Sequence, residues 1–213
     1  MRGIGAFLVL GPVFFLPAGT LRYWQAWVYM AILLIPMTLV MIFFFKKDPE
    51  RLERRMRWRE KEKTQRKIVS LGALPLMAGI LIPGFDRRWG WSSVPTALAV
   101  FAGVMVVLGY LIFVRVMMEN RYLSRIVEVV REQEVVSTGP YAVVRHPMYS
   151  GTLLLYLFTP LALGSLWAVI PFALTVIMFP LRILNEEKVL LRDLPGYGEY
   201  MEKTRFRLIP GVW

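Results

Sequence analysis

The stretch that decides the fold runs from Trp24 to Phe45 and reads WQAWVYMAILLIPMTLVMIFFF. A helix needs about 20 mostly apolar residues to cross a bilayer, and this stretch is that long and carries no charge. The chain has 213 residues, of which 56% are hydrophobic, and its mean hydropathy is +0.50. Because it holds several such runs, we predict an all-α, polytopic integral membrane protein with five to six transmembrane helices.

Further apolar segments lie on both sides of this stretch. Residues 3–19 have the positive start of a signal peptide, but the long apolar run that follows at once favours a helical hairpin over a cleaved leader. Near the other end, Gly164 can end one helix and Ser165 can cap the next. Residues 84–92 form a predicted turn. The predicted helices are 3–19, 24–45, 68–83, 93–116, 150–163 and 166–184.

Residues 46–67 are strongly basic and set the predicted orientation. They read as an amphipathic helix at the lipid headgroups, on the cytoplasmic side by the positive-inside rule. Six crossings then put the 117–149 connector and the tail after residue 184 on that same side. We therefore expect an active site that faces the cytoplasm, in a prokaryotic inner (cell) membrane.

Composition excludes several classes of function. The net charge of +11 lies in loops beside apolar segments, where anionic headgroups explain it and nucleic acid does not. With one histidine and no cysteine, we expect no metal site and no disulfide. No glycine-rich fingerprint follows a strand pattern, which excludes a Rossmann-type domain. The sequence shows no combination of serine, histidine and acidic residues that would indicate a hydrolase.

Two polar islands interrupt the second half of the chain. The first, GPYAVVRHPMYSG at residues 139–151, holds the only histidine. The second comprises Asn185–Lys188, Pro195–Tyr200 and Arg205–Pro210. In order and spacing, residues 117–213 resemble the isoprenylcysteine carboxyl methyltransferase family, to which phospholipid N-methyltransferases are related. The resemblance implies S-adenosylmethionine as cofactor and divides the chain into N-terminal membrane helices (1–116) and a catalytic region (117–213).

The first island supplies most of the predicted cofactor site. Proline restricts the residue before it to extended geometry, so His146 should project from a turn before a membrane helix. The resemblance assigns the cofactor pocket to this segment. Tyr141 is either an interfacial tyrosine or an aromatic wall that attracts the sulfonium cation. The predicted cofactor-binding residues of this island are Tyr141, Arg145, His146, Pro147, Tyr149 and Gly151.

The second island adds carboxylates and a guanidinium. Glu186 and Glu187 are either an acidic pair leaving the bilayer or acceptors for the cofactor. Either glutamate can be the direct ligand of the cofactor. We assign Glu186 to the cofactor and Glu187 to catalysis, where Glu187 or His146 can serve as a base for an amine substrate. Arg207 holds the family's Arg-x-x-Pro position, and its planar fork fits a carboxylate or phosphate. The resemblance adds Asn120 and Arg121 as catalytic candidates.

These residues predict a membrane methyltransferase that acts on a lipidic or prenyl-thio carboxylate entering from the bilayer. Methyl transfer to a carboxylate needs alignment and exclusion of water more than acid or base. Phospholipid N-methylation is the main alternative. An NADPH-dependent reductase of the sterol reductase type and a non-catalytic membrane scaffold are further alternatives.

Overall fold

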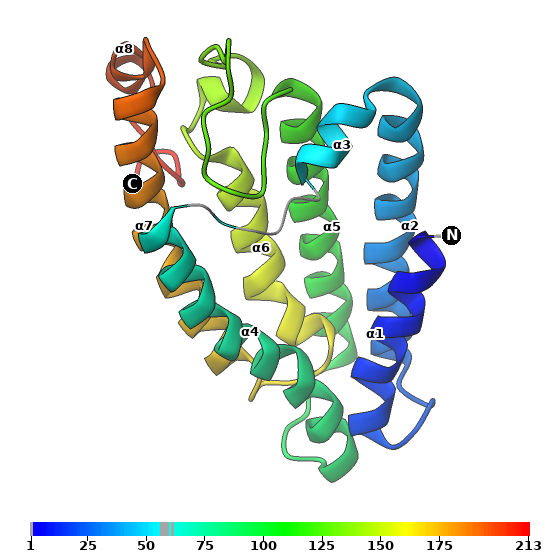
Figure 1. Ribbon diagram of the computed structural model, residues 1–213. Coiled ribbons are helices and arrows are strands. Elements are labelled where there is room, and N and C mark those ends of the chain that lie inside the picture. Colours follow the sequence, from blue (N-terminus) through cyan, green and yellow to red (C-terminus); the bar gives the residue numbers. More distant parts are fainter. Residues whose placement is uncertain (1, 56–59, 61) are drawn as a thin grey trace.

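The computed structural model describes residues 2–55, 60 and 62–213, and all the elements of this part of the chain are helical (Figure 1). This confirms the all-α prediction. In chain order the elements are α1 (Arg2–Ala18), α2 (Trp24–Lys47), α3 (Pro49–Arg55), α4 (Lys63–Trp89), α5 (Thr96–Glu119), the 3-10 turn η1 (Gly139–Ala142), α6 (Pro147–Ala162), α7 (Val169–Asp193) and α8 (Tyr197–Lys203).

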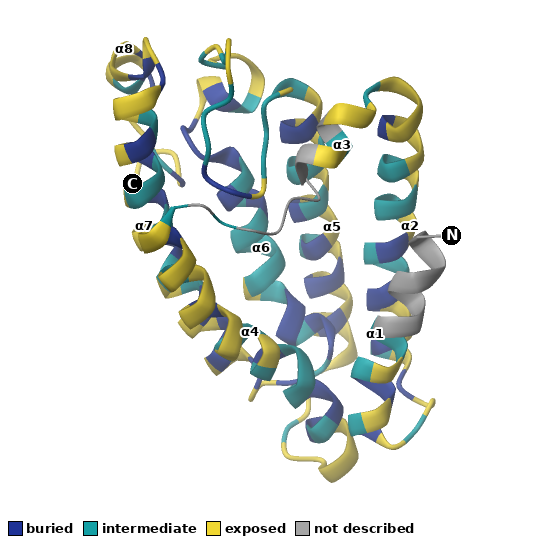
Figure 2. Ribbon diagram, viewed as in Figure 1, coloured by how far each residue is buried: buried dark blue, intermediate teal, exposed yellow. Residues whose placement is uncertain are grey.

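Four of the described helices, α2, α4, α5 and α7, are long and apolar enough to cross a membrane. The predicted number of five to six also counts α1 and α6, which are shorter, with 17 and 16 residues. The outer faces of the bundle remain exposed (Figure 2). On α4 they carry Leu71, Leu74 and Met77, each more than half exposed. Such a large exposed apolar surface marks contact with lipid, so the chain is a polytopic membrane protein.

Helices α5 and α6 pack closely because glycines face each other across their interface. A methyl group added at Gly109 would lie 2.7 Å from the carbonyl oxygen of Gly151. Small residues let membrane helices approach in this way. This pairing holds the start of α6, and with it the first polar island, beside the end of α5.

The two polar islands lie at the same end of the bundle, as predicted. The connector between α5 and η1, together with α8, lies at one end, whereas the turns that join α1 to α2 and α4 to α5 lie at the other (Figure 1). Helix α3, from the basic 46–67 segment, is at the first end as well.

The predicted turn over residues 84–92 was wrong for its first half. Helix α4 continues to Trp89 and ends at Gly90, whose φ of +64° is left-handed. Gly84 lies inside the helix, where an added methyl group would lie 2.9 Å from the Phe14 carbonyl oxygen. Packing of α4 against α1 therefore stabilises the helix past a residue that reads as a turn former.

The single amphipathic helix predicted for residues 46–67 was also wrong. Helix α3 ends at Arg55, and Lys63 begins the long helix α4, whose N-cap Glu62 accepts a hydrogen bond from the Gln65 amide. The predicted basic residues Arg57, Arg59 and Lys61 lie outside the described residues.

The last predicted membrane helix, 166–184, is longer than expected. Helix α7 begins at Val169 and runs to Asp193, so Glu186 and Glu187 lie within it and not at its end. Gly164, with a φ of +78°, marks the predicted break after α6. Ser165 accepts a hydrogen bond from the Ala168 amide but is not the N-cap of α7.

Candidate functional site

The two polar islands are joined by backbone hydrogen bonds. The Arg145 amide donates to the Phe206 carbonyl at 2.8 Å, and the His146 amide donates to the Arg207 carbonyl at 2.9 Å. Pro147 begins α6, and His146 before it has a non-helical backbone, with φ −123° and ψ 61°, in place of the extended geometry that the sequence predicts. The tail can therefore pair with residues 145–146 before the helix starts. This confirms that His146 projects from a turn.

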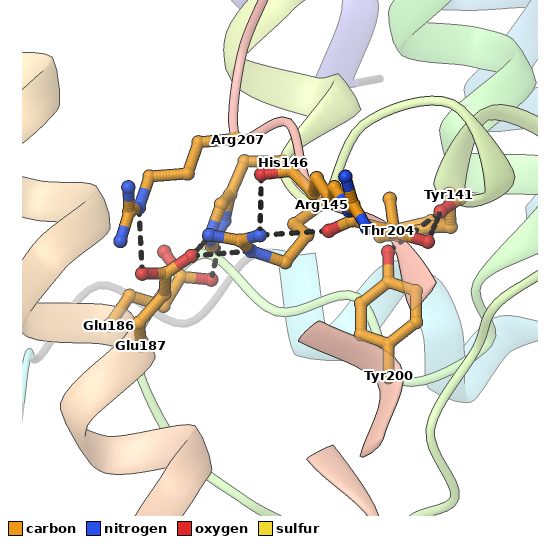
Figure 3. A network of polar contacts seen from close by, with 9 residues as sticks. Tyr141, Arg145, His146, Glu186, Glu187, Tyr200, Thr204 and Arg207 are labelled. Atoms are coloured by element: carbon orange, nitrogen blue, oxygen red, sulfur yellow. Dashed lines mark hydrogen bonds and ion pairs between the residues drawn. The ribbon is translucent and has the colours of Figure 1, made fainter. Parts of the chain in front are cut away.

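Glu187 is the centre of a buried ionic network (Figure 3). Its side chain is 5% exposed and accepts hydrogen bonds from Arg145 Nε at 2.7 Å and from Arg207 Nε at 2.9 Å. Arg145 Nη1 also donates to the carbonyl oxygens of Thr204 and Arg205, at 2.8 and 2.9 Å. A buried carboxylate is stable only with such partners. The network fixes α7, the turn before α6 and the tail relative to one another.

The buried Nε2 of the His146 ring has no hydrogen-bond partner among the described residues. Its side chain is 4% exposed, and Nε2 lies 3.4 Å from Glu187 Oε1 without hydrogen-bond geometry. Nδ1 is 4.0 Å from Glu186 Oε1. Buried polar atoms are almost always paired, so an unpaired one calls for an explanation. A bound ligand that hydrogen-bonds the imidazole would supply it.

Beside this network lies a pocket of about 890 Å³, part of it open to solvent. Residues from the connector, the start of α6, the end of α7 and α8 form its wall. Two further buried polar atoms without a partner among the described residues, Arg182 Nε and the Tyr197 hydroxyl, belong to residues of this wall. The wall includes Asn120, Arg125, Glu128, Glu134, Tyr141, Arg145, His146, Pro147, Met148, Tyr149, Arg182, Glu186, Leu190, Leu194, Tyr197 and Tyr200.

Hydrogen bonds fix several groups of this wall. The Tyr149 hydroxyl donates to Glu186 Oε2 at 3.0 Å, and Asn120 Nδ2 donates to the Tyr141 hydroxyl at 2.9 Å. The Tyr200 hydroxyl donates to the Tyr141 carbonyl at 2.7 Å. Burial raises the pKa of Tyr197, and it raises the pKa of Tyr200 to about 12. Both tyrosines in α8 are therefore neutral at physiological pH and offer hydroxyls and ring faces.

Most of the predicted site residues line this pocket. Those that do are Asn120, Tyr141, Arg145, His146, Pro147, Tyr149 and Glu186. Their individual roles stay predictions.

Four predicted site residues are not in the pocket wall. Glu187 and Arg207 lie behind it, in the ionic network. Gly151 lies at the contact of α5 and α6. Arg121 points outward, with Nη2 3.6 Å from Glu134 Oε2.

The sequence reasoning missed Arg125 and Arg182 as site residues. Arg182 lies one helical turn before Glu186, so the i,i+4 spacing on a helix could have placed it in the site. Arg125 lies in the irregular connector, where no periodicity marks the direction of a side chain.

The structure is that of a membrane protein with a polar, partly enclosed site at one end of its helices. Residues 97–195, from the first turn of α5 to just beyond α7, match the family described as phospholipid methyltransferase. The match therefore spans both polar islands as far as Pro195 and supports a membrane methyltransferase. Comparison with curated proteins gives no match.

Proposed function

We propose that this chain is an S-adenosylmethionine-dependent methyltransferase whose acceptor is a lipid held at the membrane surface. The observation that carries the proposal is the convergence of His146, Arg182 and Tyr197 on one pocket, each with a buried polar atom that lacks a partner in the part of the chain that the structure describes. The match of residues 97–195 to the phospholipid methyltransferase family supports methyl transfer as the reaction.

The residues of the pocket fit this cofactor. When bound, S-adenosylmethionine supplies an electrophilic methyl group on a sulfonium cation. Aromatic faces attract cations, and Tyr141 and Tyr197 offer aromatic rings in the pocket wall. The Glu186 carboxylate can accept hydrogen bonds from hydroxyl or ammonium donors, and His146 Nε2 can bond a further polar group. The chain needs no nucleophile of its own, because its task is to align two ligands and exclude water.

Glu187 and Arg207 take positioning roles in this proposal, in place of the direct catalytic roles that the sequence predicts. The Glu187 carboxylate already accepts from Arg145 and Arg207, so it is a weak base. Together these three residues hold His146 at the pocket and keep the tail against α6. Asn120 orients Tyr141 through its hydrogen bond. Arg121 remains a catalytic candidate on the family resemblance alone.

The acceptor atom divides the proposal into two forms. A phospholipid amine must lose a proton before attack, and Glu186, 27% exposed beside the pocket, is placed to accept it. The description of the matched family favours this form. A prenyl-thio carboxylate needs no base, and the order of the motifs favours it. We take a lipid acceptor as the proposal and the phospholipid amine as its better supported form.

Transfer of a labelled methyl group tests both forms. The purified protein in lipid nanodiscs receives S-adenosylmethionine with a labelled methyl group and either phosphatidylethanolamine or a prenylated cysteine analogue. Label in the amine product supports the phospholipid form, and label in a methyl ester supports the carboxylate form. Label in neither lipid, together with binding of NADPH, would reject the proposal in favour of a reductase.

The direction of the site is part of the proposal. We infer that the end of the bundle with the connector, α8 and α3 faces the cytoplasm of a prokaryotic cell, where the cofactor is available. The basic excess of residues 46–67 supports this orientation.

A further inference from the structure

Arg182 is a cation of the pocket that the proposed cofactor contacts leave unused. It lies on α7, one turn before Glu186, and its guanidinium carbon is 5.7 Å from the centre of the Tyr149 ring. Its Nε is buried and has no hydrogen-bond partner among the described residues. A guanidinium presents its donors as a planar fork, so a buried unused edge is a place for an oxyanion.

A second guanidinium shares the pocket from a different element. Arg125 belongs to the connector between α5 and η1 and lines the same wall as Arg182. Burial, followed by the nearby positive charge of Arg182, holds the pKa of the Arg125 guanidinium below its usual range. The fold thus brings two like charges together from distant parts of the chain. Like charges repel at short range, and an anion between them removes that cost.

Several other charged groups of the pocket wall have partners within the chain. Arg145 is hydrogen-bonded to Glu187 and to two carbonyl oxygens. Glu186 accepts from Tyr149, and Glu134 faces Arg121. Glu128 is a further carboxylate of the wall, on the connector three residues after Arg125.

We propose that Arg125 and Arg182 form the subsite that binds the oxyanion of the lipid substrate, its phosphodiester or its carboxylate. This inference rests on the proposed function and adds to it the two residues that select the substrate. Phosphate and carboxylate both match the guanidinium fork, so one subsite can serve either source. With Glu186 one turn along α7, the pocket offers a carboxylate and paired guanidiniums, complementary to a head group that carries an amine and a phosphate.

The test compares Arg125→Gln, Arg182→Gln and Arg182→Lys with the control Arg192→Gln. Arg192 lies on the same helix, is exposed, and pairs with Asp193 at 2.7 Å. Each variant is purified in nanodiscs whose carrier lipid has an uncharged headgroup, and its melting temperature is checked. Two bindings are then titrated separately: S-adenosylhomocysteine by calorimetry, and a fluorescent lipid by quenching. The lipids are phosphatidylethanolamine, a prenylated cysteine, and a diacylglycerol that has no oxyanion.

We expect both Gln variants to bind one of the two oxyanion-bearing lipids, phosphatidylethanolamine or the prenylated cysteine, about tenfold or more weakly, since a charged hydrogen bond is lost. Which lipid is affected identifies the source of the oxyanion. Arg182→Lys should recover this only in part, because lysine lacks the fork. Affinity for diacylglycerol and for S-adenosylhomocysteine should stay within twofold, and Arg192→Gln should match the unaltered protein.

Two results would overturn the inference. If the Gln variants no longer bind S-adenosylhomocysteine but still bind both oxyanion-bearing lipids, the two arginines hold the carboxylate of the cofactor. If Arg192→Gln weakens lipid binding as much as Arg182→Gln does, the effect is general surface electrostatics. Failure of the unaltered protein to bind S-adenosylhomocysteine at all would instead reject the proposed function, so the two failures remain distinct.

Discussion

The two ends of the bundle each bury a carboxylate, and they do so differently. At the end without the pocket, Asp86 on α4 is 1% exposed and accepts from the Ser92 amide and from the hydroxyls of Ser92 and Ser165, at 2.5–2.7 Å. At the other end, Glu187 is surrounded by Arg145, Arg207 and His146. Neutral donors satisfy the first carboxylate, whereas two guanidiniums, those of Arg145 and Arg207, donate to the second.

This difference separates a structural site from a functional one. Asp86 ties the turn after α4 to the turn after α6, and its hydrogen bonds are complete within the chain. The end with Glu187 adjoins a pocket in which His146, Arg182 and Tyr197 each have a buried polar atom without a partner among the described residues. Burial of an acid is thus no sign of function by itself. The sign of a functional site is a set of buried polar atoms beside the acid that have no hydrogen-bond partner among the described residues.

The largest effect should follow from Glu187→Gln. Loss of the carboxylate leaves Arg145, whose side chain is 4% exposed, without a counter-charge. Breaking a buried ion pair by removing one partner costs about 3–5 kcal/mol. We expect a melting temperature in detergent far below that of the unaltered protein, with cofactor binding lost as a consequence. An unchanged melting temperature would show that Glu187 is not the centre of the network.

The next effect should follow from His146→Ala. The ring presents a hydrogen-bonding atom to the pocket. Its loss should weaken the binding of S-adenosylhomocysteine about ten- to a hundredfold, because a hydrogen bond to a charged group contributes about 1.5–3 kcal/mol. The melting temperature without ligand should fall only by the packing lost around the buried ring, because Nε2 has no hydrogen bond to lose among the described residues. Calorimetric titration and a melting curve measured on the same sample separate the two effects. Unaltered cofactor affinity would contradict the assignment.

Asp86→Asn is the matched change at the other end. It removes charge-assisted hydrogen bonds from two serines and should cost about 1–3 kcal/mol of stability. Affinity for S-adenosylhomocysteine should remain within twofold, because Asp86 belongs to the last turn of α4, and the turn from α4 to α5 lies at the end of the bundle opposite α8 (Figure 1). The comparison between the two ends fails if this variant keeps its stability and loses the cofactor.

The smallest effect concerns the Tyr200 hydroxyl, which bonds the Tyr141 carbonyl. Burial raises the pKa of Tyr200 to about 12 from an unfolded value of 10.0, so the folded state holds this proton more tightly. Its contribution is complete below pH 10 and is lost as the pH rises through 12. Tyr200→Phe should lower stability by about 0.5–1.5 kcal/mol at neutral pH and flatten the decline between pH 10 and 12. Melting curves across that range check the slope, and an equal slope in both proteins would speak against it.

Much of the fold could be predicted because the bilayer requires long apolar helices. The apolar run 24–45 predicted helix α2, and Gly164 predicted the break between α6 and α7. The course of α4 through Gly84 could not be predicted, because contact with α1 decides it and no local signal reports that contact.

Most of the candidate site was predictable for a different reason. His146, Glu186 and Glu187 are polar residues at membrane helices, which is costly without a function. What a sequence does not give is the direction of a side chain. The neighbours Glu186 and Glu187 point to different surroundings, one to the pocket and one to the network behind it. Arg125, in the irregular connector, has no periodic pattern that would assign it to the pocket.

The most direct test of the central claim is paired titration of S-adenosylhomocysteine and NADPH into the detergent-purified protein. Two variants are titrated in parallel with the unaltered protein: His146→Ala, which changes the end with the pocket, and Asp86→Asn, which changes the opposite end. We predict binding of S-adenosylhomocysteine with a dissociation constant on the order of micromolar, weakened by His146→Ala and retained by Asp86→Asn, and no binding of NADPH. Binding of NADPH alone would contradict the account, as would S-adenosylhomocysteine binding that His146→Ala leaves unchanged.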